Sequence, residues 1–405
     1  MQTSIDPEYK LRDDVAEADG ILRACVHCGF CTATCPTYRI LGSELDSPRG
    51  RIYLIKDLLE GKEATEKTRL HLDRCLSCRS CETTCPSGVR YSRLLEIGRK
   101  IIDEKAPRSF GDKLLRKAML KMLPDTRRMG LVLHIGRLLK PLLPAELKNK
   151  IPSHKLASPR PTTQHPRRML VLEGCVQPLT TPNTNAATAR VLDRLGITLL
   201  NTPKAGCCGA INQHMSDEET AKQHMRNNIE AWWPHVEEGI EAIISTASGC
   251  GLMLKEYGEI LKNDTAYAAK AARISALCKD PCEILNNEDL SVFSNIGKDG
   301  KVAYQSSCTL QHGQKLSGAV EKILSQCGYI LTPVPDNHLC CGAAGTYTLL
   351  QPELSQQLLR NKLNALESSQ PDIIVTANVG CQMHLESGSN IPVKHWIELL
   401  DKYPT

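Results

Sequence analysis

The chain has 405 residues, of which 41% are hydrophobic and 23% charged, and its net charge is +5. This composition is ordinary for a globular protein and excludes disordered, collagen-like and low-complexity chains; the length allows two or three domains. No run of 18 apolar residues and no N-terminal secretion signal is present, so we expect a cytoplasmic protein without a transmembrane helix. The 19 cysteines outnumber the aromatic residues (3 Trp, 10 Tyr, 3 Phe). In a reducing compartment such thiols are more often metal ligands than disulfides.

The N-terminal region contains the same cysteine spacing twice, C-x2-C-x2-C-x3-C-P. Three thiolates at this spacing wrap one corner of a [4Fe-4S] cubane, and in two-cluster ferredoxins the fourth cysteine of each run binds the other cluster. We therefore expect two [4Fe-4S] clusters with crossed ligands. Cluster 1 would be held by Cys25, Cys28, Cys31 and Cys85, and cluster 2 by Cys75, Cys78, Cys81 and Cys35. A pair of zinc sites is the alternative, but zinc sites do not use a third and fourth cysteine at this spacing.

The segment 48–61 lies between the two cysteine runs and has apolar residues at helical spacing. It begins with proline and ends with glycine, which is the usual polarity of a helix. We expect residues 1–105 to form an all-α, ferredoxin-like domain.

A basic stretch without cysteine follows, over residues 106–168. From Lys105 to Arg168 the sequence contains 16 Lys or Arg and three acids. Two apolar helical faces, over 114–122 and 131–142, are flanked by these charges, a pattern typical of helices that lie on an anionic membrane surface. We expect peripheral contact with the inner membrane through 113–143; packing on the core or on a partner subunit is the alternative. Nucleic-acid binding is not expected, because the basic residues lie on leucine-rich helices.

The C-terminal part is an internal duplication in which four cysteines recur at offsets of 131–133 residues. The two sets are Cys175, Cys207, Cys208 and Cys250, and Cys308, Cys340, Cys341 and Cys381. In each set apolar runs precede the first and last cysteine, and helix-like segments lie between. Strands that alternate with helices predict a parallel sheet. We expect two α/β domains, over 169–300 and 301–405, with the cysteines at or just beyond strand ends. The fold class is thus α+β multidomain.

Each double cysteine is followed by a glycine, Gly209 or Gly342, which permits the sharp turn that would direct both thiols to one site. One iron-sulfur or zinc site per repeat, or a shared redox dithiol, would satisfy such a set. Buried, inert cysteines are the alternative. Cys278, Cys282 and Cys327 have no counterpart in the duplication, and we expect free thiols there.

Tandem cysteine runs followed by two CCG domains resemble the iron-sulfur subunits of glycolate oxidase (glycolate dehydrogenase). The resemblance rests on segments such as ILRACVHCGFCTATCPTY, LDRCLSCRSCETTCPSGVRY, AGCCGA and PDNHLCCGAAGTY, and covers nearly the whole chain. It implies an electron-transfer subunit beside FAD-containing subunits that oxidise glycolate to glyoxylate, with electrons passing to a membrane quinone or similar acceptor. The CCG domains of heterodisulfide reductase end in C-x2-C, whereas this chain has Met253 and His384 there. That departure argues against a five-cysteine cluster and makes His384 a candidate additional ligand.

The sequence contains neither G-x-G-x-x-G after a strand nor a P-loop, so we expect no catalytic residue and no flavin on this chain. Oxidation of a hydroxy acid by hydride transfer would then require a partner subunit. We predict the iron-sulfur subunit of a glycolate oxidase complex. The alternatives are the equivalent subunit of a glycerol-3-phosphate or lactate dehydrogenase, a self-contained disulfide or quinone reductase with a CCG cluster, and a zinc-stabilised scaffold.

Overall fold

The structure is a computed structural model that describes residues 1–142, 151–298 and 300–401. It divides into two compact units. The first unit contains Met1–Lys117 and His338–Leu358, and the second contains the described residues of Ala118–Asn337 and Leu359–Thr405. A segment of the second repeat thus belongs to the N-terminal unit. The expected limits 1–105, 106–168, 169–300 and 301–405 remain predictions.

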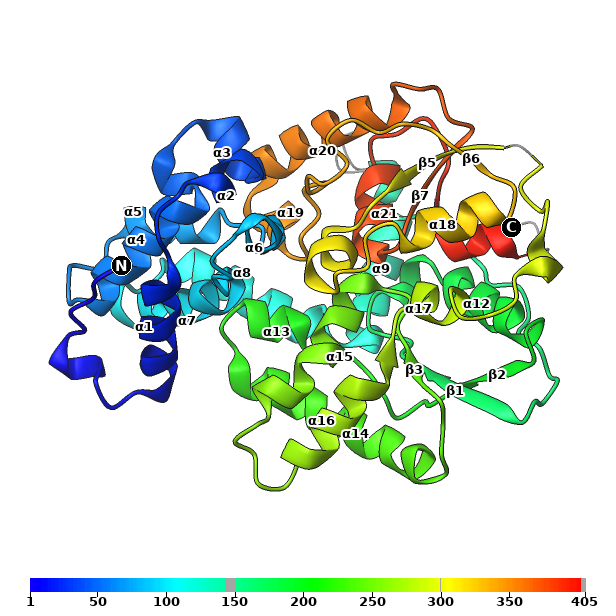
Figure 1. The fold of residues 1–405 in the computed structure, drawn as a ribbon, viewed down its shortest axis with the longest axis horizontal. Coiled ribbons are helices and arrows are strands. Elements are labelled where there is room, and N and C mark those ends of the chain that lie inside the picture. Colours follow the sequence, from blue (N-terminus) through cyan, green and yellow to red (C-terminus); the bar gives the residue numbers. More distant parts are fainter. Residues whose placement is uncertain (143–150, 299, 402–405) are drawn as a thin grey trace. The chain divides into compact units, whose positions relative to one another are not determined.

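The N-terminal region of the first unit is helical, as predicted (Figure 1). Its helices are α1 (Asp13–Ala24), α2 (Phe30–Ala33), α3 (Pro36–Leu41), α4 (Pro48–Leu59), α5 (Glu66–Asp73), α6 (Ser80–Thr84) and α7 (Tyr91–Lys105), with 3-10 turns η1 (Pro7–Tyr9) and η2 (Glu44–Asp46). The segment from the second repeat adds α19 (Tyr347–Leu350) and the start of α20 (Pro352–Glu367).

Helices α4 and α7 form the centre of this unit. The predicted helix over 48–61 is confirmed as α4, whose N-terminus is capped by Ser47, since its hydroxyl accepts a hydrogen bond from the amide of Gly50 at 3.0 Å. On α7, Gly98 allows close packing: a Cβ added there would lie 2.6 Å from Cγ1 of Ile55. This close approach fixes the position of α4 against α7, and both helices contribute residues to the cysteine-lined cavities described below.

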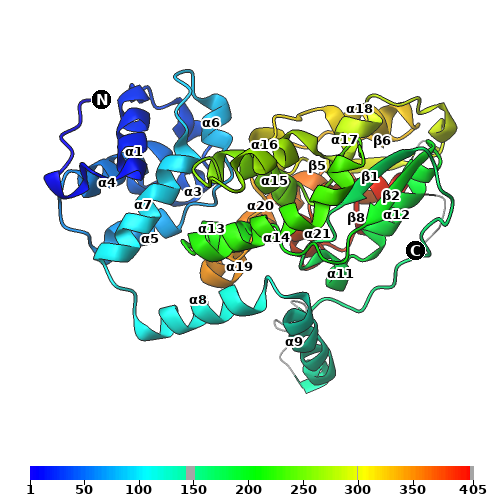
Figure 2. The ribbon, with the colours of Figure 1, turned by 90° about the horizontal axis from the view of Figure 1, so that it is seen from below.

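Helices α8 (Phe110–Met122) and α9 (Thr126–Leu139) form the described part of the basic stretch, followed by the 3-10 turn η3 (Lys140–Leu142) (Figure 2). Their exposed apolar side chains are Phe110, Leu114, Leu115, Leu131, Val132, Ile135, Leu138 and Leu139. Residues 143–150 of the expected linker, including the end of the expected membrane contact 113–143, lie outside the described residues. Among the described helices, none combines the length and apolar character needed to cross a membrane.

The second unit contains two four-stranded parallel sheets, which confirms the predicted duplication. The first has the order β2-β1-β3-β4 and the second the matching order β6-β5-β7-β8. The strands are β1 (Arg167–Val171), β2 (Ile197–Asn201), β3 (Ile243–Ile244), β4 (Cys278–Lys279), β5 (Lys301–Gln305), β6 (Ile330–Leu331), β7 (Ile373–Thr376) and β8 (Val393–His395). The register pairs Arg167 with Ile197 in the first sheet and Val302 with Ile373 in the second.

Helices connect the parallel strands, and α12 packs beside β2 (Figure 2). In the first repeat they are α11 (Gln177–Thr180), α12 (Asn183–Asp193), α13 (Ala210–His214), α14 (Glu218–Glu237), α15 (Ser248–Ile260), α16 (Ala268–Leu277), α17 (Pro281–Leu285) and the turn η4 (Ser291–Phe293). In the second repeat they are the π-turn η5 (Thr309–Gly313), α18 (Ala319–Gln326), the later part of α20, α21 (Val379–Glu386) and the turn η6 (Trp396–Leu400).

The strand order explains where the cysteines lie. From β1 the chain passes to β2 on one side and then to β3 on the other, so the carboxyl ends of β1 and β3 border a topological switch point, the usual place for a site in an open parallel sheet. Cys175 follows β1, and Cys250 lies in the first turn of the helix after β3. Cys308 and Cys381 have the corresponding places after β5 and β7.

Candidate metal centres

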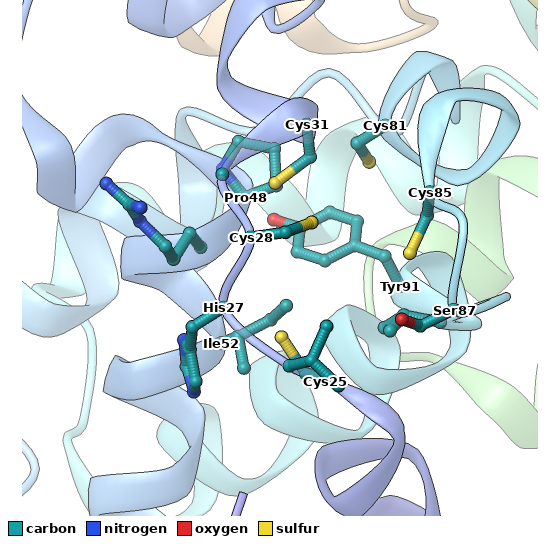
Figure 3. Close-up of a pocket in the computed structure, with 14 residues that line it drawn as sticks. Cys25, His27, Cys28, Cys31, Pro48, Ile52, Cys81, Cys85, Ser87 and Tyr91 are labelled. Carbon is teal, nitrogen blue, oxygen red and sulfur yellow. The ribbon is translucent and has the colours of Figure 1, made fainter.

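The first cavity of the N-terminal region is lined by cysteines of both runs (Figure 3). Its empty volume, which includes space open to solvent, is about 440 Å³, and it is lined by Cys25, Cys28, Cys31 and Cys85, with Cys81 at one side. Figure 3 shows these sulfur atoms around the hollow. The structure therefore brings Cys85 of the second run to the three leading cysteines of the first run, which is the grouping that the crossed assignment expects.

The second cavity contains the complementary set. Its empty volume, which includes space open to solvent, is about 370 Å³, and it is lined by Cys35, Cys75, Cys78 and Cys81, together with Tyr91. Cys81 and Tyr91 line both cavities. The two cavities are therefore direct neighbours, as an electron relay between two clusters would require.

Both cysteine runs use the same backbone geometry. His27 and Gly29 in the first run have φ values of 58° and 83°, and Ser77 and Arg79, fifty residues later, have 53° and 60°. Three of these four are not glycine, and a left-handed conformation costs about 1 kcal/mol or more at such residues. Because this strain recurs at equivalent positions of both loops, we infer that the loop geometry positions the thiols, at a cost in stability. Sequence reasoning missed it, because only Gly29 signals a left-handed residue.

The thiols of these cavities are not in disulfides. Burial raises the pKa of Cys31 to about 11, and it raises the pKa values of Cys78 and Cys81 well above the usual range. These groups are therefore protonated at neutral pH until an electrophilic partner replaces the protons. Four soft sulfur donors around one hollow are a suitable donor set for a [4Fe-4S] cluster, in which each thiolate binds a different iron.

A buried arginine lies beside the second cavity. The guanidinium of Arg51, on α4, is almost completely buried and donates to Oγ1 of Thr37 at 3.1 and 3.2 Å and to the carbonyl of His71 at 2.7 Å. Its charged neighbour is Asp46, with N···O 3.5 Å. Oγ1 of Thr37 lies 3.3 Å from Sγ of Cys35. A fixed positive charge is thus connected through one hydroxyl to a candidate cluster ligand.

The electrostatics of this arginine depend on the thiols. Burial alone would lower its pKa, but the negative charges of Cys75, Tyr91 and Cys35 in their ionised forms outweigh burial and raise the pKa of Arg51. An arginine is charged at any physiological pH. Arg51 therefore gives the second cavity a permanent, buried positive charge. The arginine that lines the first cavity, Arg49, is about one third exposed, so its charge is screened by solvent.

The four cysteines of the first repeat converge in the structure. Interactions with the thiols of Cys175 and Cys208 lower the pKa of Cys207. The Cys207 thiol in turn raises the pKa values of Cys175 and Cys208, and Cys250 also raises that of Cys208. The predicted turn is present, because Gly209 has φ +90°. Four convergent thiols at a sheet switch point can hold a metal centre or act in redox chemistry.

Two side chains hold this turn, and sequence reasoning did not single them out. Asn228 on α14 donates to the carbonyl of Cys207 at 2.9 Å, and the hydroxyl of Tyr257 on α15 donates to the carbonyl of Cys208 at 2.9 Å. Asn228 also donates to the Tyr257 hydroxyl at 3.1 Å. The available signal was a polar residue within each otherwise apolar helical face, in the segments NNIEAWWP and KEYG.

The second repeat has the same turn, with Gly342 at φ +93°. The amide of this glycine points at Sγ of Cys340 at 3.4 Å, as the amide of Gly209 points at Sγ of Cys207 at 3.4 Å. Cys340 and Cys341 belong to the first compact unit, whereas Cys308 and Cys381 belong to the second. His384 is buried on α21, one turn beyond Cys381; its role as a ligand remains a prediction.

The two repeats contact each other inside the second unit, close to cysteine-bearing segments. Oγ of Ser248, two residues before Cys250, lies 2.7 Å from Oγ1 of Thr309, the residue after Cys308. The amide of Ser248 also donates to the carbonyl of Ala377 at 3.0 Å. The repeats therefore meet at the carboxyl ends of their sheets.

The remaining cysteines, Cys278, Cys282 and Cys327, are free and buried, as expected. Within residues 1–142, 151–298 and 300–401, no three His, Cys, Asp or Glu side chains are arranged around a single metal ion. The thiolates of a cubane bind four different irons, so they lie further apart than the ligands of one ion.

Comparison with known proteins identifies the same parts. Residues 21–89 match the family described as a 4Fe-4S dicluster domain. Residues 169–255 and 302–386 each match the family described as a cysteine-rich domain. The cysteines of both cavities and both CCG sets lie within these ranges.

Two relatives align with nearly the whole chain, and a third aligns with about half of it. The glycolate oxidase iron-sulfur subunit of Escherichia coli (strain K12) is 55% identical over 403 residues, which cover 99% of each chain. The probable glycolate oxidase iron-sulfur subunit of Bacillus subtilis (strain 168) is 32% identical over 95% of this chain and 92% of that one. Lactate utilization protein A of Anoxybacillus flavithermus is 28% identical over 56% of this chain and 96% of that one. By its dicluster domain, its duplicated cysteine-rich domain and this identity, the chain belongs to the family of glycolate oxidase iron-sulfur subunits, the iron-sulfur electron-transfer subunits of an oxidoreductase complex.

Proposed function

We propose that this chain relays electrons from FAD-containing subunits that oxidise glycolate to glyoxylate toward a quinone or similar acceptor in the membrane. The observation that carries this proposal is the pair of neighbouring cavities that share Cys81 and are lined by five and four cysteines. Two one-electron centres in direct sequence are the arrangement that a relay needs. The 55% identity to a subunit named for glycolate supports the substrate.

The electron balance requires a partner. Oxidation of the hydroxyl carbon of glycolate removes two electrons and two protons, normally as a hydride and a proton. A [4Fe-4S] cluster, when bound, supplies a carrier for one electron at a time. A flavin on another subunit would accept the hydride and release its two electrons singly, which this chain's thiol sites could then receive.

The residues of the two cavities have distinct tasks in this proposal. Cys25, Cys28, Cys31 and Cys85 would hold cluster 1, and Cys75, Cys78, Cys81 and Cys35 would hold cluster 2. The buried ring of Tyr91 borders both sites and excludes water between them. Arg51 would stabilise the added negative charge of reduction at the second site, because its guanidinium is desolvated and fixed.

The CCG sets would hold further iron-sulfur centres, whose thiolates bind different irons, rather than zinc, since no three donors among the described residues are arranged around one ion. In the first repeat the convergent thiols of Cys175, Cys207, Cys208 and Cys250 support a four-ligand centre. In the second repeat Cys308, Cys340, Cys341 and Cys381, with His384 as an added ligand, are proposed from the duplication. A self-contained disulfide or quinone reductase remains the alternative for these centres.

Membrane contact is proposed for the described part of 113–143. Exposed leucines on α8 and α9 lie beside Lys and Arg in the sequence. The leucines would insert into the interface of an anionic membrane, and the basic side chains would bind its headgroups. We expect the protein on the cytoplasmic side of the inner membrane. Vesicle flotation should recover it with anionic and not with neutral vesicles; equal recovery from both, or none, would refute the contact.

Lactate is the second candidate substrate, favoured by the similarity to lactate utilization protein A. That similarity covers 56% of this chain at 28% identity, whereas the similarity to the glycolate oxidase subunit covers 99% at 55%. Glycerol 3-phosphate remains an alternative from the sequence resemblance alone.

The function is tested on the purified complex. Iron and sulfide analysis should give about eight irons or more per chain, and glycolate should produce [4Fe-4S] EPR signals only when the flavin subunits are present. Three results would each contradict the proposal: glycolate reduces the clusters of the isolated chain, lactate but not glycolate reduces the clusters of the complex, or dithionite produces no cluster signal.

A further inference from the structure

The double-cysteine turn of the second repeat, residues 340–342, has surroundings that its counterpart in the first repeat, residues 207–209, does not share. The turn at 340–342 belongs to the segment His338–Leu358, which forms one compact unit with the dicluster region. The turn at 207–209 belongs to the second unit, where Asn228 and Tyr257 of its own repeat hold it. The duplication is therefore symmetric in its turn geometry and asymmetric in the partners of the turn.

A specific hydrogen bond joins this segment to the loop of the second cavity. The hydroxyl of Tyr347, in the first turn of α19, donates to the carbonyl of Arg74 at 3.0 Å. Arg74 directly precedes Cys75, the first candidate ligand of cluster 2. Arg74 is itself fixed by an ion pair with the buried Asp46 at 3.1 Å. The backbone that carries the candidate ligand is thus linked to the segment that carries the double cysteine.

The same tyrosine lies between thiols of the two regions. Burial raises the pKa of Tyr347, and the charges of Cys75 and of Cys340 raise it further. The segment that contains Cys340 is thus joined through Tyr347 to the loop of the second cavity. Ser355, whose hydroxyl donates to the carbonyl of Gly342 at 2.9 Å, fixes the turn from the other side.

We propose that the double-cysteine turn at Cys340–Cys341 is the electron contact of the second dicluster site, and that Tyr347 is the residue that positions it. The proposal rests on the proposed function, in which the second cavity holds a [4Fe-4S] cluster and the CCG cysteines hold an iron-sulfur centre. A [4Fe-4S] cluster held by Cys75, Cys78, Cys81 and Cys35 would give up one electron, and an iron-sulfur centre with Cys340 and Cys341 among its ligands would accept it. No proton moves, and no bond is formed or broken. The relay then has a direction: first cavity, second cavity, second repeat.

The first test compares the same substitution at equivalent positions of the two repeats. EPR-monitored redox titration of the full chain should show a changed midpoint potential of the second dicluster site in Cys340→Ser and an unchanged one in Cys207→Ser. Absence of two [4Fe-4S] signals in the wild-type chain would overturn both the proposed function and this inference. Intact signals with equal behaviour of the two variants would overturn only the inference.

The second test isolates the positioning residue. Tyr347→Phe removes one hydroxyl and keeps the ring, so cluster content should remain that of wild type. After rapid mixing with less than one equivalent of dithionite, freeze-quench EPR should show the dicluster signal decaying about fivefold more slowly, the change expected when one hydrogen bond of ordinary strength is lost from the contact.

A matched control removes the same kind of bond elsewhere. The hydroxyl of Tyr329 donates to the carbonyl of Leu399 at 2.8 Å inside the second unit. Tyr329→Phe should leave the decay rate unchanged. Equal rates for Tyr347→Phe, Tyr329→Phe and wild type would overturn the positioning role, and so would a slowing of the same size in both variants.

Discussion

The dicluster region and the first cysteine-rich repeat both gather thiols, but they do it by different structural means. In the dicluster region the cysteines surround hollows of about 440 and 370 Å³, and left-handed residues in the loops direct them inward. In the first repeat the thiols shift one another's pKa values, and side chains from two helices hold the turn. One region is organised by its backbone, the other by tertiary contacts.

This difference shows which part of a metal site local sequence can encode. A run such as C-x2-C-x2-C-x3-C specifies the loop and most ligands within about a dozen residues, so the motif predicts a cluster-binding loop in any protein that contains it. The CCG set needs two strand ends, a glycine turn and two helices to bring its thiols together. Its chemistry therefore depends on the whole fold, and variants should damage the two regions in different ways.

The largest expected effect is cluster loss, and double variants test the crossed ligation. Cys28→Ser combined with Cys85→Ser should remove about four irons per chain, because both cysteines serve one cluster. Cys28→Ser combined with Cys35→Ser should remove about eight, because each cluster loses a ligand. Iron analysis of the purified full chain gives the answer. The opposite pattern would mean that each run holds its own cluster.

The next largest effect is expected at Arg51, the buried charge of the dicluster region. Arg51→Met leaves Asp46 buried with one partner fewer, which should cost about 3–5 kcal/mol of unfolding free energy in urea. Loss of a positive charge also disfavours reduction of the second cluster, so its midpoint potential should fall by the equivalent of ~1–3 kcal/mol at an effective dielectric constant near 20.

Two control variants separate these contributions. Arg51→Lys keeps the charge but not the planar fork that contacts Thr37, so it should restore much of the potential and less of the stability. Arg49→Met removes an exposed pair with Glu44 and should cost less than about 1 kcal/mol. A potential that is unchanged in Arg51→Met would show that the guanidinium has no influence on the second cluster.

The contact between the repeats predicts a pH effect that the dicluster region should not share. Burial lowers the pKa of His395 to about 4. Its Nε2 lies 2.8 Å from the carbonyl of Thr246 in the other repeat, and its Nδ1 accepts from the amide of Ile397 at 3.2 Å, so the ring is neutral with its proton on Nε2. In the unfolded chain this histidine titrates near ~6.5.

Because the pKa of His395 is lowered in the folded state, acid destabilises the folded protein. Above about pH 6.5 both states are neutral and the stability is fully present; as the pH falls from ~6.5 to ~4 the unfolded state binds a proton that the folded state does not, and up to ~3 kcal/mol is lost. Urea unfolding of the full chain between pH 7 and 4.5 measures it. His395→Gln should flatten the curve in this window, while His134→Gln, at an exposed position on α9, serves as control. Equal slopes for wild type and His395→Gln would refute the assignment.

Much of the fold was predictable because its signals are local or repeated. The helix over 48–61, the strands before Cys175 and Cys308, and the turns at Gly209 and Gly342 all appear as predicted. The equal spacing of the two cysteine sets indicated two similar domains, and the two sheets indeed have the same strand order.

What the sequence did not reveal depends on contacts between distant segments. In the sequence nothing distinguishes Arg51 from the other arginines of this region. Only the packing of α4 shows that it is buried beside Thr37. The sequence assigns residues 338–358 to the second repeat, whereas in the structure they belong to the N-terminal unit. Side-chain burial and partner choice arise from tertiary structure, which a single sequence does not specify.

The smallest effect is expected at the tyrosine that holds the turn of the first repeat. Tyr257→Phe removes the donor to the carbonyl of Cys208 and an acceptor for Asn228, so the unfolding free energy should fall by about 1 kcal/mol. The turn should also open more often, and in metal-free protein Cys207 and Cys208 should react faster with an alkylating reagent, located by mass spectrometry. Cys31 in the dicluster region should react at the wild-type rate, because its loop is held by backbone geometry that the variant does not touch. Faster alkylation at all three cysteines would mean that the two regions do not open independently, and the contrast between them would then be wrong.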